Sequence, residues 1–450
     1  MANRTTGPID VTAVIDSNPL GRFQLRTIVL CALVLILDGF DLQAIGYVAP
    51  AIMQEWKVDR AALGVLFGAG LIGMMIGSLA FSVLADRVGR RPVLIASTIF
   101  FGLAMLATSQ ASSIEELRWL RLITGIGLGG IMPNGMALAG EYSPARRRIL
   151  VMMLVSCGFT FGAALGGVLA SVLIPAFGWR SVFVFGGIAP LLVAAAMIVW
   201  LPESMQLLLA NARSTARFPR WLSQIDPRLE VGPHATYLRP EKAARMPVAD
   251  LFREGRAATT LLLFTICFMN LLDLYFLSNW IPTVLTEANF PLTYAVLAGT
   301  MLQVGGTVGT IVMAWLIERY GFARVLIPCF LVAAAGIVAI GRPDSPALLI
   351  AVVTIVGFCI VGGQPAINAL TATRYPTALR ATAIGWSLGI GRIGSIVGPV
   401  MGGMLLQLQW PVAWVFMVVA VPALISTALI AILCSRATDA MPAPKITLAH

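Results

Sequence analysis

The chain has 450 residues, of which 58% are hydrophobic and only 12% are charged, and its mean hydropathy is +0.88. This composition is too apolar for one or two soluble domains and is typical of a chain that crosses a bilayer many times. A net charge of +10 could indicate nucleic-acid binding. The basic residues are spread over alternating loops instead of forming one patch, so we expect no nucleic-acid partner.

Apolar runs of about 20 residues, the length that spans a bilayer, predict twelve transmembrane helices. The expected spans are residues 26–49, 61–82, 92–110, 119–140, 149–173, 181–201, 258–282, 293–317, 324–341, 347–372, 380–405 and 411–434. Of the 31 Lys and Arg residues, 24 fall in one set of alternating loops and the termini, and five fall in the other set. This asymmetry predicts that both termini are cytoplasmic. The first 25 residues lack a short apolar core, so we expect no cleavable signal peptide.

The six cysteines lie in or at the end of predicted helices and show neither a disulfide framework nor metal-ligand spacing. The two histidines are His234, in the long central loop, and His450, the last residue. A proton relay inside the membrane would therefore have to use carboxylates. We expect no metal site and no cofactor.

Two carboxylates, Asp38 and Asp41, stand three residues apart in the apolar run from Thr27 to Ala49. Helical positions i and i+3 share a face, so both side chains should point into protein or a watery cavity and away from lipid. Two acids this close in a low dielectric cannot both ionise cheaply. We therefore expect the pair to hold and carry a proton.

A shift of 232 residues lays the second half of the chain on the first almost without gaps. Asp41 falls on Asp273, and the tetrapeptide at 86–89 falls on the one at 318–321. The repeat predicts two six-helix halves that face each other across a site near the midplane. The expected parts are a cytoplasmic N-terminal segment 1–25, a first bundle 26–201, a cytoplasmic linker 202–257, a second bundle 258–434 and a cytoplasmic tail 435–450.

Two loops carry charged motifs. The loop after the second predicted helix contains Asp86-Arg87-Val88-Gly89-Arg90-Arg91, and the loop after the fourth runs from Glu141 to Arg148. They resemble the two cytoplasmic signatures of the major facilitator superfamily, Gly-x3-Asp-Arg-x-Gly-Arg-Arg and Glu-x6-Arg, with Ser82 replacing the leading Gly. In the second half Thr373 replaces the Glu of the second signature, so the charge network there should differ.

This resemblance implies the major facilitator fold, an all-α polytopic membrane protein with twelve transmembrane helices in two pseudo-symmetric six-helix bundles. It also implies ion pairs between helix ends that break during gating, although the same charges could act only as topology anchors. The expected gating residues are Asp86, Arg87, Arg90, Arg91, Arg148, Glu318, Arg319 and Arg380.

Within the superfamily, the chain resembles the aromatic acid:proton symporters. The similarity rests on Asp38-Gly39-Phe40-Asp41, on 46–50 (Gly-Tyr-Val-Ala-Pro) and on 279–283 (Asn-Trp-Ile-Pro-Thr). It implies import of aromatic carboxylates such as benzoate or hydroxybenzoate, with protons, across the bacterial inner membrane by alternating access. It also implies that an Asp41–Arg121 pair couples protonation to gating, with a static ion pair as the alternative. The expected proton-coupling residues are Asp38, Asp41, Arg121 and Glu141.

Arg392 is placed roughly 18 Å from the cytoplasmic side by counting helical residues from Arg380, which is near the midplane. A guanidinium there, with no acid in its own helix, is costly, and its planar fork fits a substrate carboxylate. Pairing with Asp273 or with helix-end carbonyls is the alternative. The other polar and aromatic candidates could equally serve interhelical hydrogen bonding or packing. The expected substrate-binding residues are Arg392, Phe40, Tyr47, Asn270, Asp273, Gln364, Asn368 and Trp386.

Other functions stay open on the sequence alone. They are uptake of a non-aromatic organic anion such as a sugar acid or muconate, efflux, and sensing of aromatic acids by a transporter-like receptor. The linker shows no recognisable output module, which disfavours a sensor. No nucleophile–histidine pair, metal cluster or phosphate-binding loop appears, so we do not expect an enzyme. We expect a monomer whose partners are the carboxylate, protons and the lipid bilayer.

Overall fold

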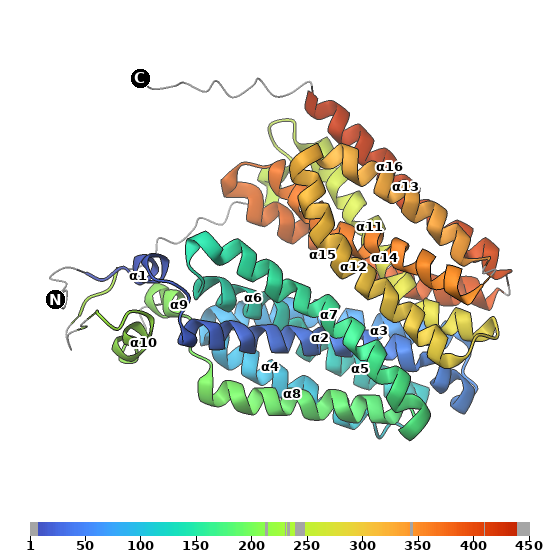
Figure 1. Ribbon diagram of the computed structural model, residues 1–450, viewed down its shortest axis with the longest axis horizontal. Coiled ribbons are helices and arrows are strands. Elements are labelled where there is room, and N and C mark those ends of the chain that lie inside the picture. Colours follow the sequence, from blue (N-terminus) through green and yellow to red (C-terminus); the bar gives the residue numbers. More distant parts are fainter. Residues whose placement is uncertain are drawn as a thin grey trace. The chain divides into compact units, whose positions relative to one another are not determined.

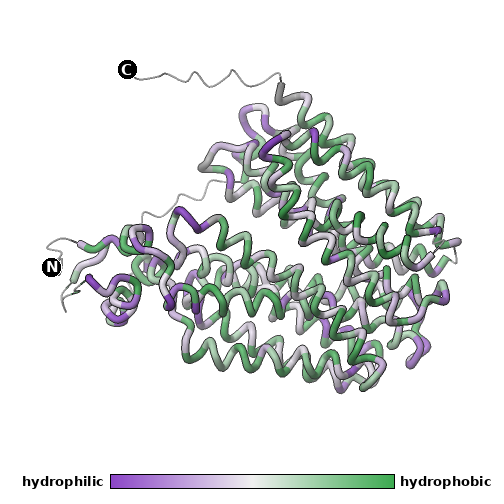
Figure 2. The backbone as a smooth tube through the Cα atoms, in the orientation of Figure 1, coloured by the Kyte–Doolittle hydropathy of each residue, from purple (hydrophilic) through white to green (hydrophobic). Residues whose placement is uncertain are grey.

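The computed structural model describes residues 8–211, 215–229, 231, 235–238, 248–342, 345–408 and 410–438. Long helices dominate these residues (Figure 1), and twelve of the described helices are long and apolar enough to cross a membrane. Hydrophobic residues run along the helices, while many hydrophilic residues lie near their ends (Figure 2). The predicted number of spans is confirmed.

Six helical spans come from the first half of the chain and six from the second. The first six are α2 (Arg22–Trp56), α3 (Arg60–Val88), α4 (Arg90–Thr108), α5 with α6 (Ile114–Gly129 and Ile131–Glu141), α7 (Ala145–Phe177) and α8 (Arg180–Trp200). The others are α11 (Ala257–Glu287), α12 (Leu292–Tyr320), α13 (Phe322–Ile340), α14 (Pro346–Thr373), α15 (Thr377–Gln407) and α16 (Val412–Thr438). Several helices extend past the apolar runs because backbone hydrogen bonding continues into polar flanking residues that hydropathy does not count.

Short helices lie outside the spans, in the N-terminal segment and in the linker. They are α1 (Val11–Ser17), α9 (Met205–Ala210), α10 (Phe218–Ile225) and the 3-10 helix η1 (Val248–Leu251). Asp10 begins α1 as its N-cap and accepts hydrogen bonds from the backbone N–H groups of Thr12 and Ala13. Helix α1 packs against α9 and α10 (Figure 1). Helices α9 and α10 of the linker are therefore folded against the N-terminal segment.

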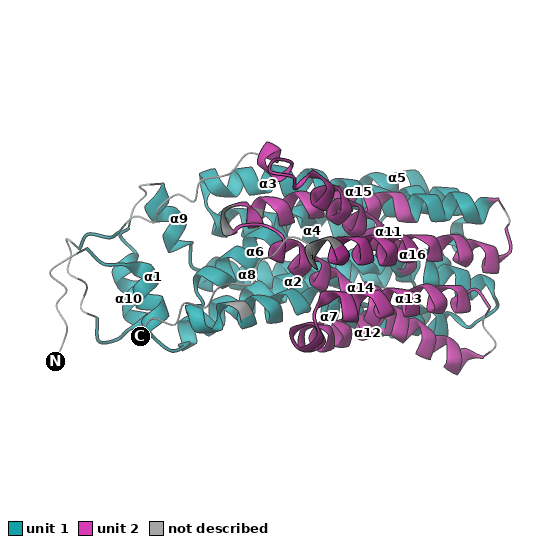
Figure 3. Ribbon diagram, turned by 90° about the horizontal axis from the view of Figure 1, so that it is seen from above, with its two compact units in different colours: residues 1–244, 278–300, 399–407 teal, residues 245–277, 301–398, 408–450 magenta. Residues whose placement is uncertain are grey.

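The chain divides into two compact units (Figure 3). Unit 1 comprises residues 1–244, 278–300 and 399–407, and unit 2 comprises residues 245–277, 301–398 and 408–450. Unit 1 thus contains the first six spans together with the end of α11, the start of α12 and the end of α15. Unit 1 has two ends (Figure 1). The linker end carries the Asp86–Arg91 loop, and the far end carries the α2–α3 connection.

Glycines bring the helices of unit 1 into backbone contact. On α3 and α5, a Cβ atom at Gly73, Gly77 or Gly125 would lie only 2.0–2.1 Å from a backbone oxygen of the other helix. On α2 and α7, a Cβ atom at Gly39 or Gly162 would lie 1.9 or 1.8 Å from such an oxygen. Small residues spaced four apart are a common way for membrane helices to approach closely. The second contact fixes α7 beside the acids of α2, and the first fixes α5 against α3.

Unit 2 repeats this packing between α12 and α14. Gly305, Gly309 and Gly357 stand 232 residues after Gly73, Gly77 and Gly125. A Cβ atom at any of these three positions would lie 2.0–2.3 Å from a backbone oxygen of the facing helix. The internal repeat of the sequence therefore extends to the residues that set helix-to-helix distance.

Candidate functional site

The two acids of α2 lie inside unit 1. The side chains of Asp38 and Asp41 are 1% and 0% exposed, and Arg121 of α5 is 1% exposed. Gly39, between the acids, lies at the backbone contact with α7, which shields that side of α2. A Cβ atom built on Gly70 of α3 would lie 3.7 Å from the Arg121 guanidinium. The glycine therefore leaves space for the arginine.

The expected ion pair between Arg121 and Asp41 is present. The Nη1 atom of Arg121 lies 2.9 Å from Oδ1 of Asp41, and Nη2 donates to the Asp41 backbone carbonyl at 3.3 Å. The second carboxylate oxygen, Asp41 Oδ2, is buried and has no hydrogen-bond partner, and Nε of Arg121 has none either. The guanidinium therefore contacts only one carboxylate oxygen of Asp41. The other oxygen can accept a proton or a hydrogen bond from water.

Two aromatic side chains of α2 are buried in helix packing. The ring of Phe40 lies 5.5 Å from that of Phe185 on α8. The hydroxyl of Tyr47 donates to the backbone carbonyl of Ala163 on α7 at 3.0 Å. Packing inside unit 1 accounts for both side chains, and substrate contact stays a prediction for them.

A polar cluster joins α11 and α14 within unit 2. The Asn270 amide donates to Oε1 of Gln364 at 2.7 Å, and Nε2 of Gln364 lies 3.3 Å from Oδ1 of Asn368 and 3.5 Å from Sγ of Cys267. The carbonyl oxygen of the Asn270 side chain is buried and has no hydrogen-bond partner. The side-chain oxygen of Asn270 is therefore a free hydrogen-bond acceptor in this cluster.

Arg392 lies on α15 close to this cluster. A Cβ atom on its neighbour Gly391 would lie 2.8 Å from Sγ of Cys267. Arg392 is half-buried, and its guanidinium forms no hydrogen bond or ion pair with any residue that the structure describes. Asp273 is fully buried, and neither of its carboxylate oxygens has a hydrogen-bond partner. The alternative pairing of Arg392 with Asp273 is therefore not formed.

Trp386, also on α15, is 47% exposed. It lies on the same helix as Arg392, six residues earlier, so it is not on the adjacent turn. Its contact with a substrate ring stays a prediction.

At the linker end of unit 1, Glu141 and Glu203 hold the start of α4. Nη1 of Arg90 lies 2.5 Å from Oε1 of Glu141, and the Ser204 hydroxyl donates to the same carboxylate. Oε1 of Glu203 accepts from the backbone N–H groups of Arg90 and Arg91 at 2.9 and 3.1 Å. A carboxylate at a helix start is favourable because it meets free N–H groups and the positive end of the helix dipole. Gly89 precedes this helix with φ +127°, a conformation that favours glycine.

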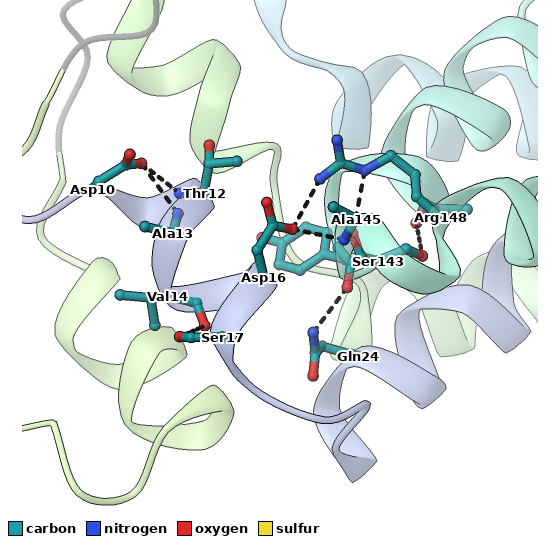
Figure 4. A network of polar contacts seen from close by, with 12 residues as sticks. Asp10, Thr12, Ala13, Val14, Asp16, Ser17, Gln24, Ser143, Ala145 and Arg148 are labelled. Carbon is teal, nitrogen blue, oxygen red and sulfur yellow. Dashed lines mark hydrogen bonds and ion pairs between the residues drawn. The ribbon is translucent and has the colours of Figure 1, made fainter. Parts of the chain in front are cut away.

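Tyr142 and Asp16 extend this network. The Tyr142 hydroxyl donates to the backbone carbonyl of Glu203 at 2.6 Å. Burial, reinforced by the negative charges of Glu141 and Glu203, raises the pKa of Tyr142 well above its ordinary value, so the hydroxyl stays a donor. Figure 4 shows Asp16 of α1 beside the backbone N–H of Ala145 and the guanidinium of Arg148, at 2.7 and 3.3 Å. The N-terminal segment therefore takes part in the charge network of the signature loops.

The charged residues of the second half that correspond to the signature loops do not form such an ion-pair network among the described residues. Glu318, Arg319 and Arg380 are exposed. Among the described residues no ion pair involves Glu318 or Arg380, while the Arg319 guanidinium lies 5.8 and 5.5 Å from the rings of Trp315 and Tyr320. In the first half, Asp86 and Arg87 are exposed, and Asn211 donates to the Asp86 backbone carbonyl at 2.8 Å. Gating roles for these residues stay predictions.

The far end of unit 1 contains contacts that sequence reasoning missed. Nε of Arg60 on α3 lies 2.8 Å from Oε1 of Glu287 on α11, and its Nη1 donates to the carbonyl of Leu406 on α15 at 2.8 Å. Away from this end, the buried Gln43, two residues after Asp41, donates to the Ser278 carbonyl at 2.5 Å. The available signal was the charged residue at the start of one span and the acid at the end of another.

Glu203 was also missed. Its signal was an acid between Pro202 and Ser204, directly after a span and on the same side as a basic loop.

Comparison with known proteins identifies the family. The Major Facilitator Superfamily model matches residues 31–309 and 263–447. The 4-hydroxybenzoate transporter PcaK of Pseudomonas putida is 39% identical over 93% of this chain and 94% of its own length. The gallate transporter of Pseudomonas putida is 38% identical over 97% of this chain and 98% of its own length.

A solved structure supports the fold. A bacterial homolog of the human lysosomal transporter Spinster matches with a TM-score of 0.75 at 16% identity, covering 95% of this chain and 100% of that chain. At this identity the likeness concerns the fold alone. The family match and the two relatives show that the chain belongs to the Major Facilitator Superfamily and, within it, to the aromatic acid transporters, so it is a multi-pass membrane transporter and not an enzyme.

Proposed function

We propose that the protein imports hydroxylated aromatic carboxylates across the bacterial inner membrane together with protons. Its relatives are named for 4-hydroxybenzoate and gallate, which are both benzene rings that carry a carboxylate and at least one hydroxyl. The observation that carries the proposal for this chain is the unneutralised guanidinium of Arg392 inside a transmembrane helix. A charge at that depth costs at least about 2.5–3.5 kcal/mol, so it calls for an anionic partner.

Arg392 is the proposed anchor for the substrate carboxylate. Its planar fork can donate two parallel hydrogen bonds to a carboxylate, and the Asp273 carboxyl does not occupy it. Its neighbour Gly391 packs against Cys267, whose thiol contacts Gln364. The amides of Asn270, Gln364 and Asn368 are proposed to supply polar contacts. The open side-chain oxygen of Asn270 suits a ring hydroxyl, which can donate to it.

The proposed proton site is the acid group of α2. A proton on the open Oδ2 of Asp41 would remove the charge that Arg121 pairs with, and so loosen the contact between α2 and α5. Such a change links the protonation of one buried group to the packing of two helices. Asp38 supplies a second carboxyl one turn away on α2, and Glu141 lies in the network at the linker end.

The linker end is proposed to be cytoplasmic, because its loops belong to the set of alternating loops and termini that holds 24 of the 31 Lys and Arg residues. Reporter fusions within residues 205 to 250 and after His450 should both report the cytoplasm. A fusion that reports the opposite side would contradict this orientation.

Uptake into proteoliposomes tests the function. The purified full chain should accumulate labelled 4-hydroxybenzoate when an inward proton gradient is imposed, and excess gallate or benzoate should compete. Muconate and a sugar acid should not compete. Equal competition by the sugar acid would show that the substrates are not restricted to aromatic acids. Accumulation that needs a sodium gradient would show that sodium, and not the proton, is the coupling ion.

Arg392→Lys tests the anchor. An ammonium cannot reproduce the two-point contact, so the affinity for 4-hydroxybenzoate in isothermal titration should fall by about tenfold or more. The matched control is Arg380→Lys, which changes an exposed arginine of the same helix and should leave the affinity unchanged. An unchanged affinity in Arg392→Lys would move the carboxylate site away from α15.

A further inference from the structure

Unit 1 contains a cavity of about 400 Å³ at its linker end, away from the acids of α2. Four elements contribute to it. They are the starts of α2 and α4, the end of α8 with the residues after it, and α10 of the linker. The candidate transport site does not use this cavity.

The lining of the cavity is strongly basic. It contains Arg26, Arg91, Arg217 and Arg220, and none of the described residues that line it is acidic. Arg91 donates to the Ile198 carbonyl at 2.6 Å, but its Nε atom is buried and has no hydrogen-bond partner. Arg26, Arg217 and Arg220 form no ion pair with any described residue. The cavity therefore concentrates positive charge that no described acidic side chain neutralises.

The nearest acid along the chain does not compensate this charge. Glu203 follows Pro202, which lines the cavity, but its Oε1 atom accepts from the backbone N–H groups at the start of α4. That carboxylate is engaged with the helix start.

The helix α10 presents its basic side to the cavity because of its sequence pattern. Arg217, Arg220, Trp221 and Gln224 follow the spacing i, i+3, i+4, i+7 and therefore share one face, and all four line the cavity. The side chains of Phe218, Leu222 and Ile225 are buried, and α10 packs against α1 and α2. Burial of the apolar face fixes the helix so that its arginines converge with Arg26 and Arg91.

One side of the same cavity is apolar and faces outward. Ile198, Val199 and Trp200 form the last turn of the membrane-spanning helix α8 and are 51%, 71% and 50% exposed. Exposed apolar residues at the end of a span contact lipid chains, and tryptophan favours the level of the headgroups. A soluble anion would need the arginines alone, whereas a lipid needs both the basic and the apolar side.

We propose that this cavity binds the headgroup of an anionic phospholipid, with the phosphate held by the four arginines and the acyl chains lying along the end of α8. Arginine matches phosphate with two parallel hydrogen bonds, and basic pockets at the headgroup level are suited to anionic lipids. The bound lipid would tie α10 of the linker to the ends of α2, α4 and α8. This proposal does not depend on the identity of the transported substrate.

The test uses the purified full chain in a neutral detergent. Thermal unfolding is followed while phosphatidylglycerol or cardiolipin is titrated in, with phosphatidylcholine, glycerol phosphate and inorganic phosphate as separate arms. Anionic lipid should raise the unfolding temperature saturably, and native mass spectrometry should show retained lipid. The other three arms should have little effect.

The variant Arg217→Gln/Arg220→Gln removes two exposed arginines of the cavity and leaves the buried face of α10 intact. Its half-saturating concentration of anionic lipid should rise by roughly tenfold or more. The control Arg147→Gln/Arg228→Gln removes two exposed arginines of unit 1 that do not line the cavity, and it should respond like the parent.

Three outcomes would overturn the proposal. A saturable response to inorganic phosphate or glycerol phosphate equal to that of the lipid would make the cavity a site for soluble anions. An equal rise of the half-saturating lipid concentration in the control variant would show that the lipid responds to surface charge in general and not to this cavity. An unchanged lipid response in the Arg217/Arg220 variant, with its folding confirmed by the parent unfolding temperature in detergent, would place the lipid elsewhere.

Discussion

At the scale of single residues, the chain holds the ionisable side chains of its spans in two different states. Arg121 and Asp41 neutralise each other inside unit 1. Arg392 and Asp273, in unit 2, are each without a hydrogen-bond or ion-pair partner among the described residues. A paired charge can stabilise the fold and can also act in a conformational switch. Burying an unpaired charge costs free energy unless a ligand or a proton neutralises it.

The Arg121–Asp41 pair predicts a strongly non-additive mutant cycle. Asp41→Asn leaves a buried guanidinium without its counter-charge, and Arg121→Gln leaves a buried carboxylate, so each should cost on the order of 3–5 kcal/mol. The double variant removes both charges and should recover much of that stability, as measured by thermal unfolding in detergent. Gradient-driven uptake should be lost in all three variants. Additive losses of stability, or full uptake by Asp41→Asn, would contradict the prediction.

Asn270 predicts a change of specificity. Its open side-chain oxygen is proposed to accept from the ring hydroxyl, so Asn270→Leu should weaken 4-hydroxybenzoate binding by about tenfold while benzoate, which lacks the hydroxyl, is little affected. Competition for uptake by the two acids measures the ratio. Equal losses for both acids would show that Asn270 supports the fold through Gln364 and does not read the substrate.

At the scale of the elements, glycine spacing sets which helices can touch. The contacts of α3 with α5 and of α2 with α7 place Arg121 and α7 around the acids, and α12 with α14 repeats the first of them after 232 residues. Without side chains at these positions the backbones meet directly, so the buried charges are held at fixed distances.

Gly162→Ala should therefore destabilise the protein. Its Cβ atom would lie 1.8 Å from the backbone oxygen of Ile36, so α2 and α7 must separate, at a cost of roughly 1–3 kcal/mol. Gly385→Ala on α15 is the control, because nothing lies within 4 Å of the added atom and alanine favours a helix by about 1 kcal/mol. Unfolding temperatures compare the two. Equal unfolding temperatures of the two variants would show that α2 and α7 can accommodate the added methyl group without loss of stability.

At the scale of the whole molecule, the far end of unit 1 joins segments from both halves of the sequence. Arg60 of α3 contacts Glu287 and the Leu406 carbonyl, the indole N–H of Trp280 donates to the Pro399 carbonyl at 2.9 Å, and Phe67 packs edge-on against Trp280. In the alternating-access cycle proposed for this protein, the far end would open at one stage. The Arg60 contacts would then be polar contacts that break.

Arg60→Gln should favour the state that is open at the far end. Arg60 is only about one-third exposed, and the partly exposed ion pair contributes about 1 kcal/mol or less, so the population should shift by roughly threefold to fivefold. The readout is the labelling rate of a cysteine at the buried position Thr283 by a membrane-impermeant maleimide.

Arg118→Gln is the control for this change, because it breaks an ion pair with Glu115 inside a single helix. It should leave the labelling rate unchanged. An equal increase in both variants, or none in Arg60→Gln, would show that the Arg60 contacts do not hold the far end closed.

The sequence by itself determined the twelve spans, the two-fold repeat and the acids of α2, because hydropathy, spacing and repetition are properties of neighbouring residues. It also indicated that Arg121 and Asp41 would meet, since few charges can be buried without a partner. Only the tertiary structure decided that Arg392 does not pair with Asp273, that Glu203 caps α4, that Arg60 reaches Glu287 and that four arginines surround one cavity. These features depend on distances between residues far apart in the chain, which are set by helix packing and not by local pattern.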